Sequence, residues 1–328
     1  MKILGGLDVK RWHAFLDSVE DATVFQTPEM SEVFASTKNY SPLFVAIEED
    51  DEIQSLVLAS LIKEGGGVKG AMSSRAVITG GPLAEGGSVG TLLGAFDERA
   101  RSGALYAQIR NLRDMSQFRG AFEEAGYVYE EHLNYVHDLL RSPAEIFSDF
   151  SDGRKKGIKK AESRGIREKV AEGKGDVDVF YEILSHTYRE ARVPLADKSL
   201  FLAAWRILVP KGMARLVLAL KGDEVLAARF YLTHRGIIHD WYAGASPKGK
   251  TDNASELLVW SAMRWGNANN YKLFDFGGAG KPGEHYGPGE FKRRFGGVKT
   301  TFGRFQKIYH PVRYLAGKKG YSILKKLG

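Results

Sequence analysis

Residues 273–297 read LFDFGGAGKPGEHYGPGEFKRRFGG, and the interpretation of the whole chain starts from this stretch. It begins as a short apolar strand, Leu273 to Phe276, which one carboxylate, Asp275, interrupts. A loop rich in glycine and proline follows, and glycine lets a backbone turn through positive φ and approach a ligand closely. A strand that ends in such a loop is a common place for a site in an α/β protein.

The loop leads into Phe291-Lys-Arg-Arg-Phe295, a cationic segment with an aromatic residue at each end. Two interpretations are open. In the first, Phe291 and Lys292 belong to a functional site that the glycine loop positions. In the second, the loop is only a connection, and Phe291 and Phe295 anchor a helix in the core.

Composition limits the class of protein. The chain has 328 residues, enough for about two domains. Its 43% hydrophobic and 27% charged residues are ordinary for a globular protein. The formal net charge of +7 suits a polyanionic or membrane-surface partner. The absence of cysteine excludes disulfides, thiolate nucleophiles and cysteine-ligated metals.

The location is predicted from what the sequence lacks. No apolar run approaches the ~20 residues of a membrane span, and the N-terminus has no signal-peptide pattern. We therefore expect a cytoplasmic protein, with peripheral contact at the inner membrane face as an option. The basic amphipathic tail 312–327 either touches a membrane surface or docks as a terminal helix. Its basic and apolar residues are Lys318, Lys319, Lys325 and Lys326, with Tyr321, Ile323, Leu324 and Leu327.

Hydrophobic periodicity and turn signals predict alternating helices and strands. In the first half they predict helices over 7–19, from Pro28 with Thr27 as N-cap, over 88–101 and over 115–125, and strands over 43–47, 53–62, 76–78, 105–109 and 127–139. In the second half they predict helices from Ser142-Pro143 and over 153–164, 177–191, 198–208 and 253–267, and strands over 166–170, 215–220, 225–233, 236–242, 273–276 and 300–309.

The two halves show a weak internal repeat. The segment VAIEEDDEI at 45–53 matches VLALKGDEV at 217–225 in pattern, and the helix and strand of 92–109 resemble those of 257–276. We therefore predict two similarly folded α/β domains, 1–140 and 141–328. Each would be a mixed sheet flanked by helices.

Several chemistries lack their motifs. His234 and His239 have no companion ligand at metal-binding spacing, so we expect strand residues and no metal site. The chain has no Walker loop, no Gly-x-Gly-x-x-Gly between a strand and a helix, and no Gly-x-Ser-x-Gly elbow.

Two basic elements remain as candidates. Residues 154–164 read RKKGIKKAESR, and on a helix Lys156, Lys159 and Lys160 share one face. That face either neutralises phosphates or is simply solvated. Lys248 and Lys250 lie in PKGKTDN, just before a predicted helix, where backbone N–H groups and two lysines favour an anion. An ordinary charged turn is the alternative.

These motifs together resemble the Fem-type (FemABX) aminoacyltransferases and the wider family of Fem-like acyltransferases. The matching segments are 156–165 (KGIKKAESRG), 241–246 (WYAGAS), the helix 257–265, 274–278 (FDFGG) and 291–297 (FKRRFGG). They follow the family's order through most of the second half, and VFQTP at 24–28 is the best local match in the first half. The resemblance implies two tandem acetyltransferase-like (GNAT) domains.

The resemblance also implies a reaction, the transfer of an aminoacyl group from aminoacyl-tRNA to an amine of a peptidoglycan or other cell-envelope precursor. Phe291 would stack on the terminal adenosine, and Lys292 would hold phosphate or stabilise charge on the ester carbonyl. Lys160 and Tyr242, with Lys156 and Trp241 in the same motifs, would contact a phosphate-bearing acceptor. Asp275 would orient or deprotonate the amine. No cofactor and no covalent enzyme intermediate are required.

Two other functions stay open. One is an N-acyltransferase that uses acyl-CoA. The GNAT signature Arg/Gln-x-x-Gly-x-Gly/Ala is missing, but Pro247-Lys-Gly-Lys250 occupies its place and could bind a pyrophosphate. The other is a protein without catalysis that binds RNA or an anionic membrane surface.

Overall fold

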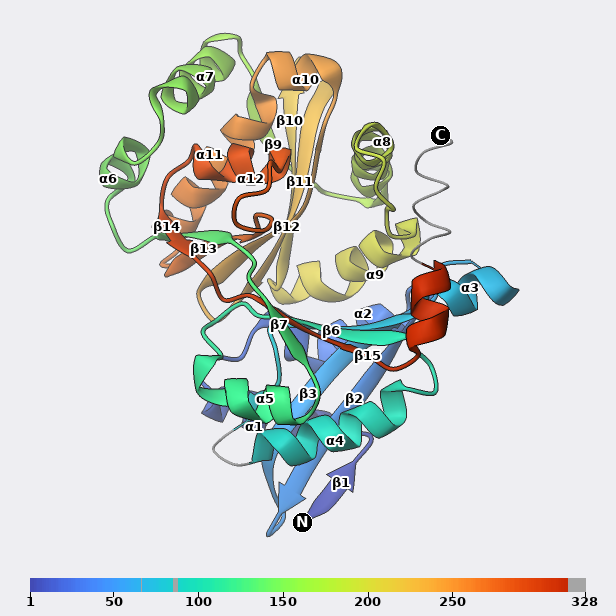
Figure 1. Ribbon diagram of the computed structural model, residues 1–328. Coiled ribbons are helices and arrows are strands. Elements are labelled where there is room, and N and C mark those ends of the chain that lie inside the picture. Colours follow the sequence, from blue (N-terminus) through green and yellow to red (C-terminus); the bar gives the residue numbers. More distant parts are fainter. Residues whose placement is uncertain (66, 85–87, 318–328) are drawn as a thin grey trace. The chain divides into compact units, whose positions relative to one another are not determined.

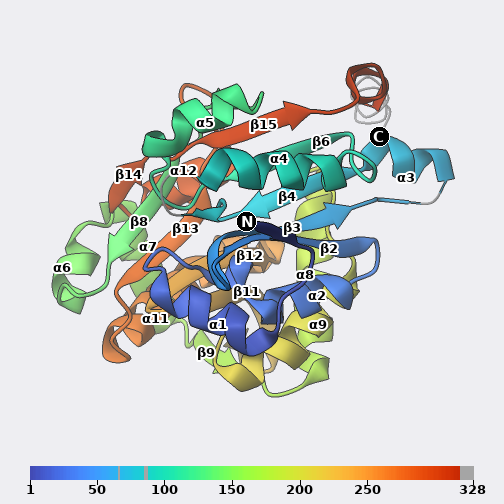
Figure 2. The ribbon, with the colours of Figure 1, turned by 90° about the horizontal axis from the view of Figure 1, so that it is seen from below.

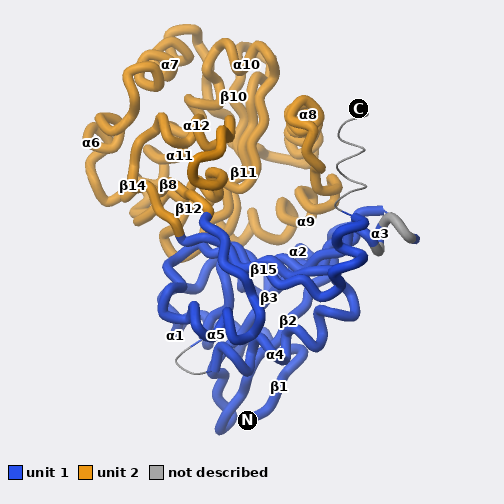
Figure 3. The backbone as a smooth tube through the Cα atoms, viewed as in Figure 1, with its two compact units in different colours: residues 1–131, 302–328 blue, residues 132–301 orange. Residues whose placement is uncertain are grey.

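The computed structural model describes residues 1–65, 67–84 and 88–317 (Figure 1). The chain divides into two compact units (Figure 3). Unit 1 contains Met1–Glu131 and the chain from Phe302 onward, and unit 2 contains His132–Thr301.

Unit 1 is an eight-stranded mixed sheet with helices on both faces. Its elements are β1 (Lys2–Leu4), α1 (Val9–Ser18), η1 (Val24–Gln26), α2 (Pro28–Ala35), β2 (Tyr40–Glu49), β3 (Glu52–Ile62), α3 (Gly67–Ser73), β4 (Arg75–Thr79), β5 (Leu83–Ala84), α4 (Val89–Ala100), β6 (Tyr106–Arg110), η3 (Ser116–Phe118), α5 (Arg119–Glu124), β7 (Val128–Glu130) and β15 (Arg304–Ile308). A further helix begins at residue 311 and continues to 317, the last described residue.

The two faces of this sheet follow from residue alternation along its strands. Val45 and Ile47 of β2 point to the side covered by α4, where Phe96 is fully buried. Phe44 points to the opposite side, and its ring lies 4.2 Å from that of Trp12 in α1. Figure 2 shows α4 and α5 on one side of the sheet and α1 and α2 on the other.

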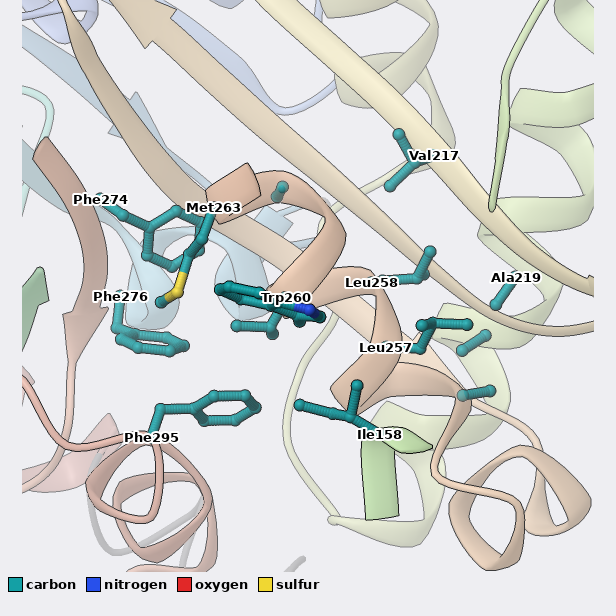
Figure 4. Packing of buried hydrophobic residues seen from close by; sticks show 14 of the residues in the cluster. Ile158, Val217, Ala219, Leu257, Leu258, Trp260, Met263, Phe274, Phe276 and Phe295 are labelled. Atoms are coloured by element: carbon teal, nitrogen blue, oxygen red, sulfur yellow. The ribbon is translucent and has the colours of Figure 1, made fainter. Parts of the chain in front are cut away.

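Unit 2 is a seven-stranded mixed sheet. Its elements are β8 (Asn134–Asp138), α6 (Pro143–Ser148), α7 (Asp152–Ser163), β9 (Arg167–Val170), α8 (Lys174–Glu190), α9 (Lys198–Leu208), η4 (Val209–Lys211), β10 (Ala214–Lys221), β11 (Glu224–His234), β12 (Ile237–Ala245), α10 (Pro247–Thr251), α11 (Ala254–Ala268), β13 (Leu273–Gly278), α12 (Gly287–Arg293) and β14 (Val298–Thr300). Its core lies between α11 and the sheet, where Trp260 and Met263 meet Phe274, Phe276 and Phe295 (Figure 4).

The two sheets have the same topology. Unit 1 has the order β1-β2-β3-β4-β6-β15-β7, and unit 2 has β9-β10-β11-β12-β13-β8-β14. In each, one parallel pair, β4 with β6 or β12 with β13, joins otherwise antiparallel neighbours. The first long hairpin carries a bulge at Ile47/Glu48 in unit 1 and at Ala219/Leu220 in unit 2, at matching positions of the predicted repeat. The predicted mixed α/β fold with two similar domains is therefore confirmed.

The units exchange one strand each, which the sequence did not suggest. Residues 127–139, expected as one strand, form β7 in unit 1 and β8 in unit 2, where β8 pairs with β13 and β14. Residues 300–309, also expected as one strand, end β14 and then form β15, which pairs with β6 and β7. Gly303, at φ 71°, breaks the second of these runs.

The exchange moves the unit boundaries away from the expected ranges 1–140 and 141–328. Residues 132–140 belong to unit 2, and the chain from Phe302 onward belongs to unit 1. Strand pairing rather than chain order decides the division, because β8 and β15 each fill the position beside the central parallel pair of their sheet.

Candidate functional site

The central parallel pair of unit 2 separates part of the way along. β12 and β13 pair only over Ile237–His239 and Leu273–Asp275, although β12 continues to Ala245. Within the described residues, no other strand pairs with β12 on that side beyond His239. β13 instead continues toward β8, and Gly277 takes a φ of 68° at the point of separation. This opening lies at the carboxyl ends of two parallel strands, where α/β sheets place their ligands.

Lys292 lies at this opening. Its ammonium donates to the carbonyl oxygens of Phe276 at 2.5 Å, Gly278 at 2.9 Å and Gly277 at 3.3 Å. The cation thus comes from α12 and contacts the last residues of β13. These three carbonyls match the three N–H donors of the ammonium, so Lys292 can act on a bound acyl group through its charge, or by exchanging one of these contacts.

Asp275 is buried beneath the opening and holds it in shape. Its carboxylate accepts from Asn134 Nδ2 at 2.6 Å and from the backbone N–H of Gly277 at 2.7 Å, and His239 Nδ1 lies 3.2 Å away. Burial raises the pKa of Asp275, but the hydrogen bonds and charge interaction of His239 and the donors Asn134 and Gly277 outweigh it, so the pKa lies below its ordinary value. Asp275 is therefore an ionised acceptor with three partners.

Two buried arginines support the segment that carries Lys292. Arg229 pairs with Asp240 at 2.6 Å and donates to Ser255, and Arg154 pairs with Glu256. The guanidinium carbons of Arg154 and Arg229 lie 4.2 and 5.2 Å from the centroid of the Phe291 ring.

Arg154 also donates to the backbone oxygen of Phe291. Phe295 is fully buried in the core, and Phe291 packs against the core while partly buried. The anchoring interpretation therefore holds for Phe295. Phe291 is held between the core and two cations.

Trp241 and Tyr242 lie on β12 beyond the opening, within an aromatic cluster. Tyr242 lies edge-on to Phe201 at 4.8 Å, and Trp241 contacts both Phe201 and Phe230. Tyr188 of α8 lies 6.1 Å from Tyr242, and burial, with smaller contributions from Tyr286 and Asp240, raises its pKa to about 12. Both predicted residues are partly buried, so each presents only part of its ring.

The predicted basic helix is α7, and its cations separate into two groups. Lys156, Lys159 and Lys160 are exposed, and no ion pair joins them to any other described residue. Arg154 and Arg164 instead bind the start of α11, through Glu256 and Asp252. The predicted face of Lys156, Lys159 and Lys160 is exposed, whereas Arg154 of the same basic run is 8% exposed.

Lys248 and Lys250 lie on the short helix α10 rather than in an open loop. Lys248 pairs with Glu224 and Lys250 pairs with Glu190, all of them exposed. The Gly249 backbone lies against Leu226, where a side chain would collide with the Leu226 carbonyl. The two lysines therefore have intramolecular partners at the place where the sequence suggested an anion.

The structure describes only the start of the predicted basic tail 312–327. The basic tail residues from Lys318 to Leu327 lie outside the described residues. Within the described ranges, no group of three or more His, Cys, Asp or Glu could hold a metal ion. None of the helices described there is long and apolar enough to span a bilayer.

Sequence reasoning missed five residues near the opening: Asn134, Arg154, Arg229, His239 and Asp240. Asn134 comes from the exchanged strand β8, and no local pattern could place it beside Asp275. Arg229 and Asp240 offered a signal, because charged residues inside otherwise apolar strands are rarely buried without a partner.

Comparison with known proteins identifies a family model and solved structures that this chain resembles. A family model described as "Acetyltransferase (GNAT) domain" matches residues 150–293. No curated protein sequence matches the chain.

Several solved structures resemble the chain, including these three. The structure of FemX has a TM-score of 0.71 at 15% identity, and the match covers 96% of this chain and 99% of that chain. The structure of L-PGS from Bacillus licheniformis has a TM-score of 0.59 at 15% identity, covering 97% and 98%. A tandem GNAT protein from the clavulanic acid biosynthesis pathway has a TM-score of 0.61 at 10% identity, covering 94% and 98%.

These matches support the resemblance that the motifs indicated. The tandem GNAT arrangement and the Fem-like fold are confirmed, and the GNAT domain over 150–293 confirms the prediction of an acyltransferase. The matched segment contains most of unit 2, including the opening between β12 and β13.

Proposed function

This chain is an acyltransferase with the Fem-like tandem GNAT fold, and from that premise we propose that it transfers an aminoacyl group from aminoacyl-tRNA to an amine of a cell-envelope precursor. One observation carries the proposal. The ammonium of Lys292 lies among three carbonyl oxygens at the point where β12 and β13 separate. A positive charge that the backbone holds in place at this opening can stabilise the negative charge that develops when an amine attacks an ester.

The reaction needs little covalent chemistry from the protein. The acceptor amine attacks the ester carbon, a C–N bond forms, and the C–O bond to the ribose breaks. The proton lost by the amine passes to the departing ribose oxygen. Lys292 stabilises the negative charge that develops on the ester oxygen, and the three backbone carbonyls place its ammonium beforehand.

Asp275 acts as a positioning residue in this proposal. Its carboxylate has a lowered pKa and three donors around it, so it is a poor proton acceptor. Its carboxylate accepts a hydrogen bond from the Gly277 N–H, and the Gly277 carbonyl is one of the three that accept from the Lys292 ammonium. The acceptor amine is then oriented by the shape of the opening, with Tyr242 and Trp241 on its β12 side.

The donor requires a polyanion-binding surface, and α7 supplies a candidate. Lys156, Lys159 and Lys160 are exposed and unpaired within the described chain. Each phosphate contact would release counterions and make binding salt-dependent. Phe291 has core and arginine contacts, so we propose that only its exposed edge meets the terminal adenosine.

Acyl-CoA is the second candidate donor. The GNAT family match over 150–293 favours it, and the similar tandem GNAT structure is specified as the form without AcCoA. The structure of α10 counts against it, because Lys248 and Lys250 are paired and Gly249 is packed on Leu226. We propose a cytoplasmic location, with an envelope or lipid acceptor at the inner membrane face.

A donor screen tests the proposal. The protein is incubated with mixed aminoacyl-tRNAs and, separately, with mixed acyl-CoAs, each with an amine acceptor pool. Mass spectrometry then identifies which donor is consumed and which amide forms. We expect loss of aminoacyl-tRNA with formation of one amide. Consumption of acyl-CoA alone would replace the first proposal by the second, and turnover of neither donor would contradict both.

A further inference from the structure

Unit 1 contains a cavity of ≈ 270 Å³ on the side of the sheet where β4 and β6 begin. It lies between the end of β3, the loop into α3, the connection from α4 to β6, and the start of the helix that begins at residue 311. Its lining includes three cationic side chains and one imidazole: Lys63, Arg101, Arg313 and His310. Among the residues that the structure describes, no Asp or Glu lines it.

The cations of this cavity are not neutralised by the carboxylates nearby. Glu64 follows Lys63 in sequence, but its carboxylate pairs with Arg75 at 2.5 Å. Asp97 is one turn before Arg101, but it is 2% exposed and accepts from Tyr127, Tyr309 and Lys307. Within the described chain, no ion pair joins Lys63, Arg101 or Arg313 to a carboxylate.

Hydrogen bonds and one close backbone approach between described residues fix part of the cavity wall. Ser73 Oγ accepts from Glu64 N–H at 2.9 Å and donates to the Gly70 carbonyl at 3.2 Å, which closes the loop into α3. Gly70 must be glycine, because a Cβ there would collide with the Gly65 carbonyl.

The other wall is fixed by side chains. His310 Nε2 lies 2.8 Å from the Arg101 carbonyl, which only accepts, so Nε2 carries the hydrogen. Tyr314, next to Arg313, accepts from Gln306 at 3.1 Å and its ring lies edge-on to Tyr106 at 5.3 Å. Arg313 therefore projects from a helix that is docked on the sheet.

From this arrangement we propose that the cavity binds a phosphate monoester group. Guanidinium and ammonium groups form charge-assisted hydrogen bonds with phosphate, and a cluster of unpaired cations without a carboxylate favours an anion of high charge. The volume lies below the ~300–1,000 Å³ of sites for drug-sized ligands, so a small head group fits better than a whole nucleotide cofactor. All the residues that line this site belong to unit 1.

The phosphate could come from a free small molecule or from the head group of a lipid, and two probes distinguish these sources. The first is inorganic phosphate, titrated calorimetrically against chloride at matched ionic strength. The second is a phosphatidylcholine vesicle with and without phosphatidic acid, measured by co-sedimentation. The full chain is used in both.

The test variant is Lys63→Gln/Arg101→Gln, and the matched control is Lys10→Gln/Lys299→Gln, which removes two exposed cations elsewhere. We expect saturable binding of one phosphate per chain, at least tenfold weaker in the test variant and unchanged in the control. Vesicle binding that needs phosphatidic acid and the same two side chains assigns a lipid source. Phosphate binding without vesicle binding assigns a free phosphate ester.

The proposal is overturned if the wild-type chain binds neither probe. It is also overturned if the test variant binds as well as the wild type, or if the control loses as much affinity as the test variant. Thermal melts of all three proteins check that the exposed substitutions leave the fold intact.

Discussion

The central pair of parallel strands stays paired along its length in unit 1 and separates in unit 2. In unit 1, β4 and β6 pair along their whole length, from Arg75–Tyr106 to Thr79–Arg110, and Gly80 N–H continues the ladder to the Arg110 carbonyl. In unit 2, the equivalent pair separates after three residues, and Lys292 contacts the freed carbonyls. Two copies of one topology thus differ in whether the central parallel pair closes.

The side chains around the two positions explain this difference. In unit 1, Gln26 is buried at the end of β4, where it donates to Gly81 O and accepts from Thr23 N–H. Gln26 thus provides hydrogen-bond partners for backbone groups near this turn from within unit 1. In unit 2, Asp275 fixes the Gly277 N–H but leaves the carbonyls of 276–278 to a long, flexible side chain, that of Lys292. We infer that unit 2 carries the chemistry and unit 1 has a structural or binding role.

The largest effect should come from Lys292→Ala. Removal of one preorganised donor to a developing oxyanion typically lowers kcat by roughly 10²–10³. We expect a loss of that size in transfer activity, measured with the donor that the screen identifies. Arg294→Ala, an exposed cation two residues away, is the control and should retain activity. Equal activity of the two variants would remove Lys292 from the mechanism.

The exchanged strand β8 should make stability depend on pH. Burial lowers the pKa of His137 to about 4, against a smaller opposing contribution from Asp149. Between pH 6.5 and 4 the unfolded chain therefore binds a proton that the folded chain does not. His137 therefore leaves the free energy of unfolding unchanged above pH 6.5. As the pH decreases from there, it lowers this free energy, by about 3 kcal/mol at pH 4.

Denaturant unfolding at several pH values measures this dependence, and His137→Gln is the comparison. The variant should have a flatter profile between pH 6.5 and 4, whatever its absolute stability. Parallel profiles would show that other groups cause the acid sensitivity. In unit 1, the exchanged strand β15 is held instead by Lys307 and Tyr309 on Asp97, so its contribution should not follow this profile.

Asp275→Asn tests whether the opening depends on its support. The substitution keeps the size of the side chain but replaces one acceptor oxygen by a donor, which disturbs the contacts with Asn134, Gly277 or His239. A small misplacement of a catalytic group can cost on the order of 10² in rate. We expect a lower kcat with little change in KM. If Asp275 were the proton acceptor, the pH–rate profile would lose its acidic limb, and a positioning role leaves that limb in place.

Gln26→Ala should have the reverse effect, on stability without activity. The substitution leaves the buried Thr23 N–H and Gly81 carbonyl unpaired, which costs about 1–3 kcal/mol. Thermal unfolding measures the loss, and turnover per folded molecule should equal that of the wild type. A large loss of kcat in this variant would contradict the division of roles between the units.

The sequence predicted the order of elements well because hydrophobic spacing is a local signal. The helix that begins at Pro28, the strands predicted over 43–47 and 53–62, and the strand that begins at Leu273 all appear where they were expected. It failed where long-range pairing decides. Glu131 to Leu133 is too short a break to reveal that β7 and β8 belong to different sheets, and Asn134 reaches Asp275 only through that exchange. The burial of Arg154 within the basic run could not be predicted, because Glu256, its partner, lies far away in sequence.

The smallest effect is expected from substitutions in α7, which test whether unit 2 also binds the donor. Lys156→Gln/Lys159→Gln removes two exposed cations that no described carboxylate neutralises. If both contact phosphates, tRNA binding should weaken, and the slope of log affinity against log salt should fall by about 1 for each contact. Filter binding at several salt concentrations measures the slope, with Lys10→Gln/Lys299→Gln as the control of equal charge.

A parallel decrease in the control would mean that only net charge matters. An unchanged slope in the α7 variant would place the polyanion elsewhere, because a counterion effect follows the contacted phosphates and not the total charge. The functional difference between the two units would then concern only the opening between β12 and β13. Unit 2 would hold the reacting groups, and the cations that hold the donor would have to be sought outside α7.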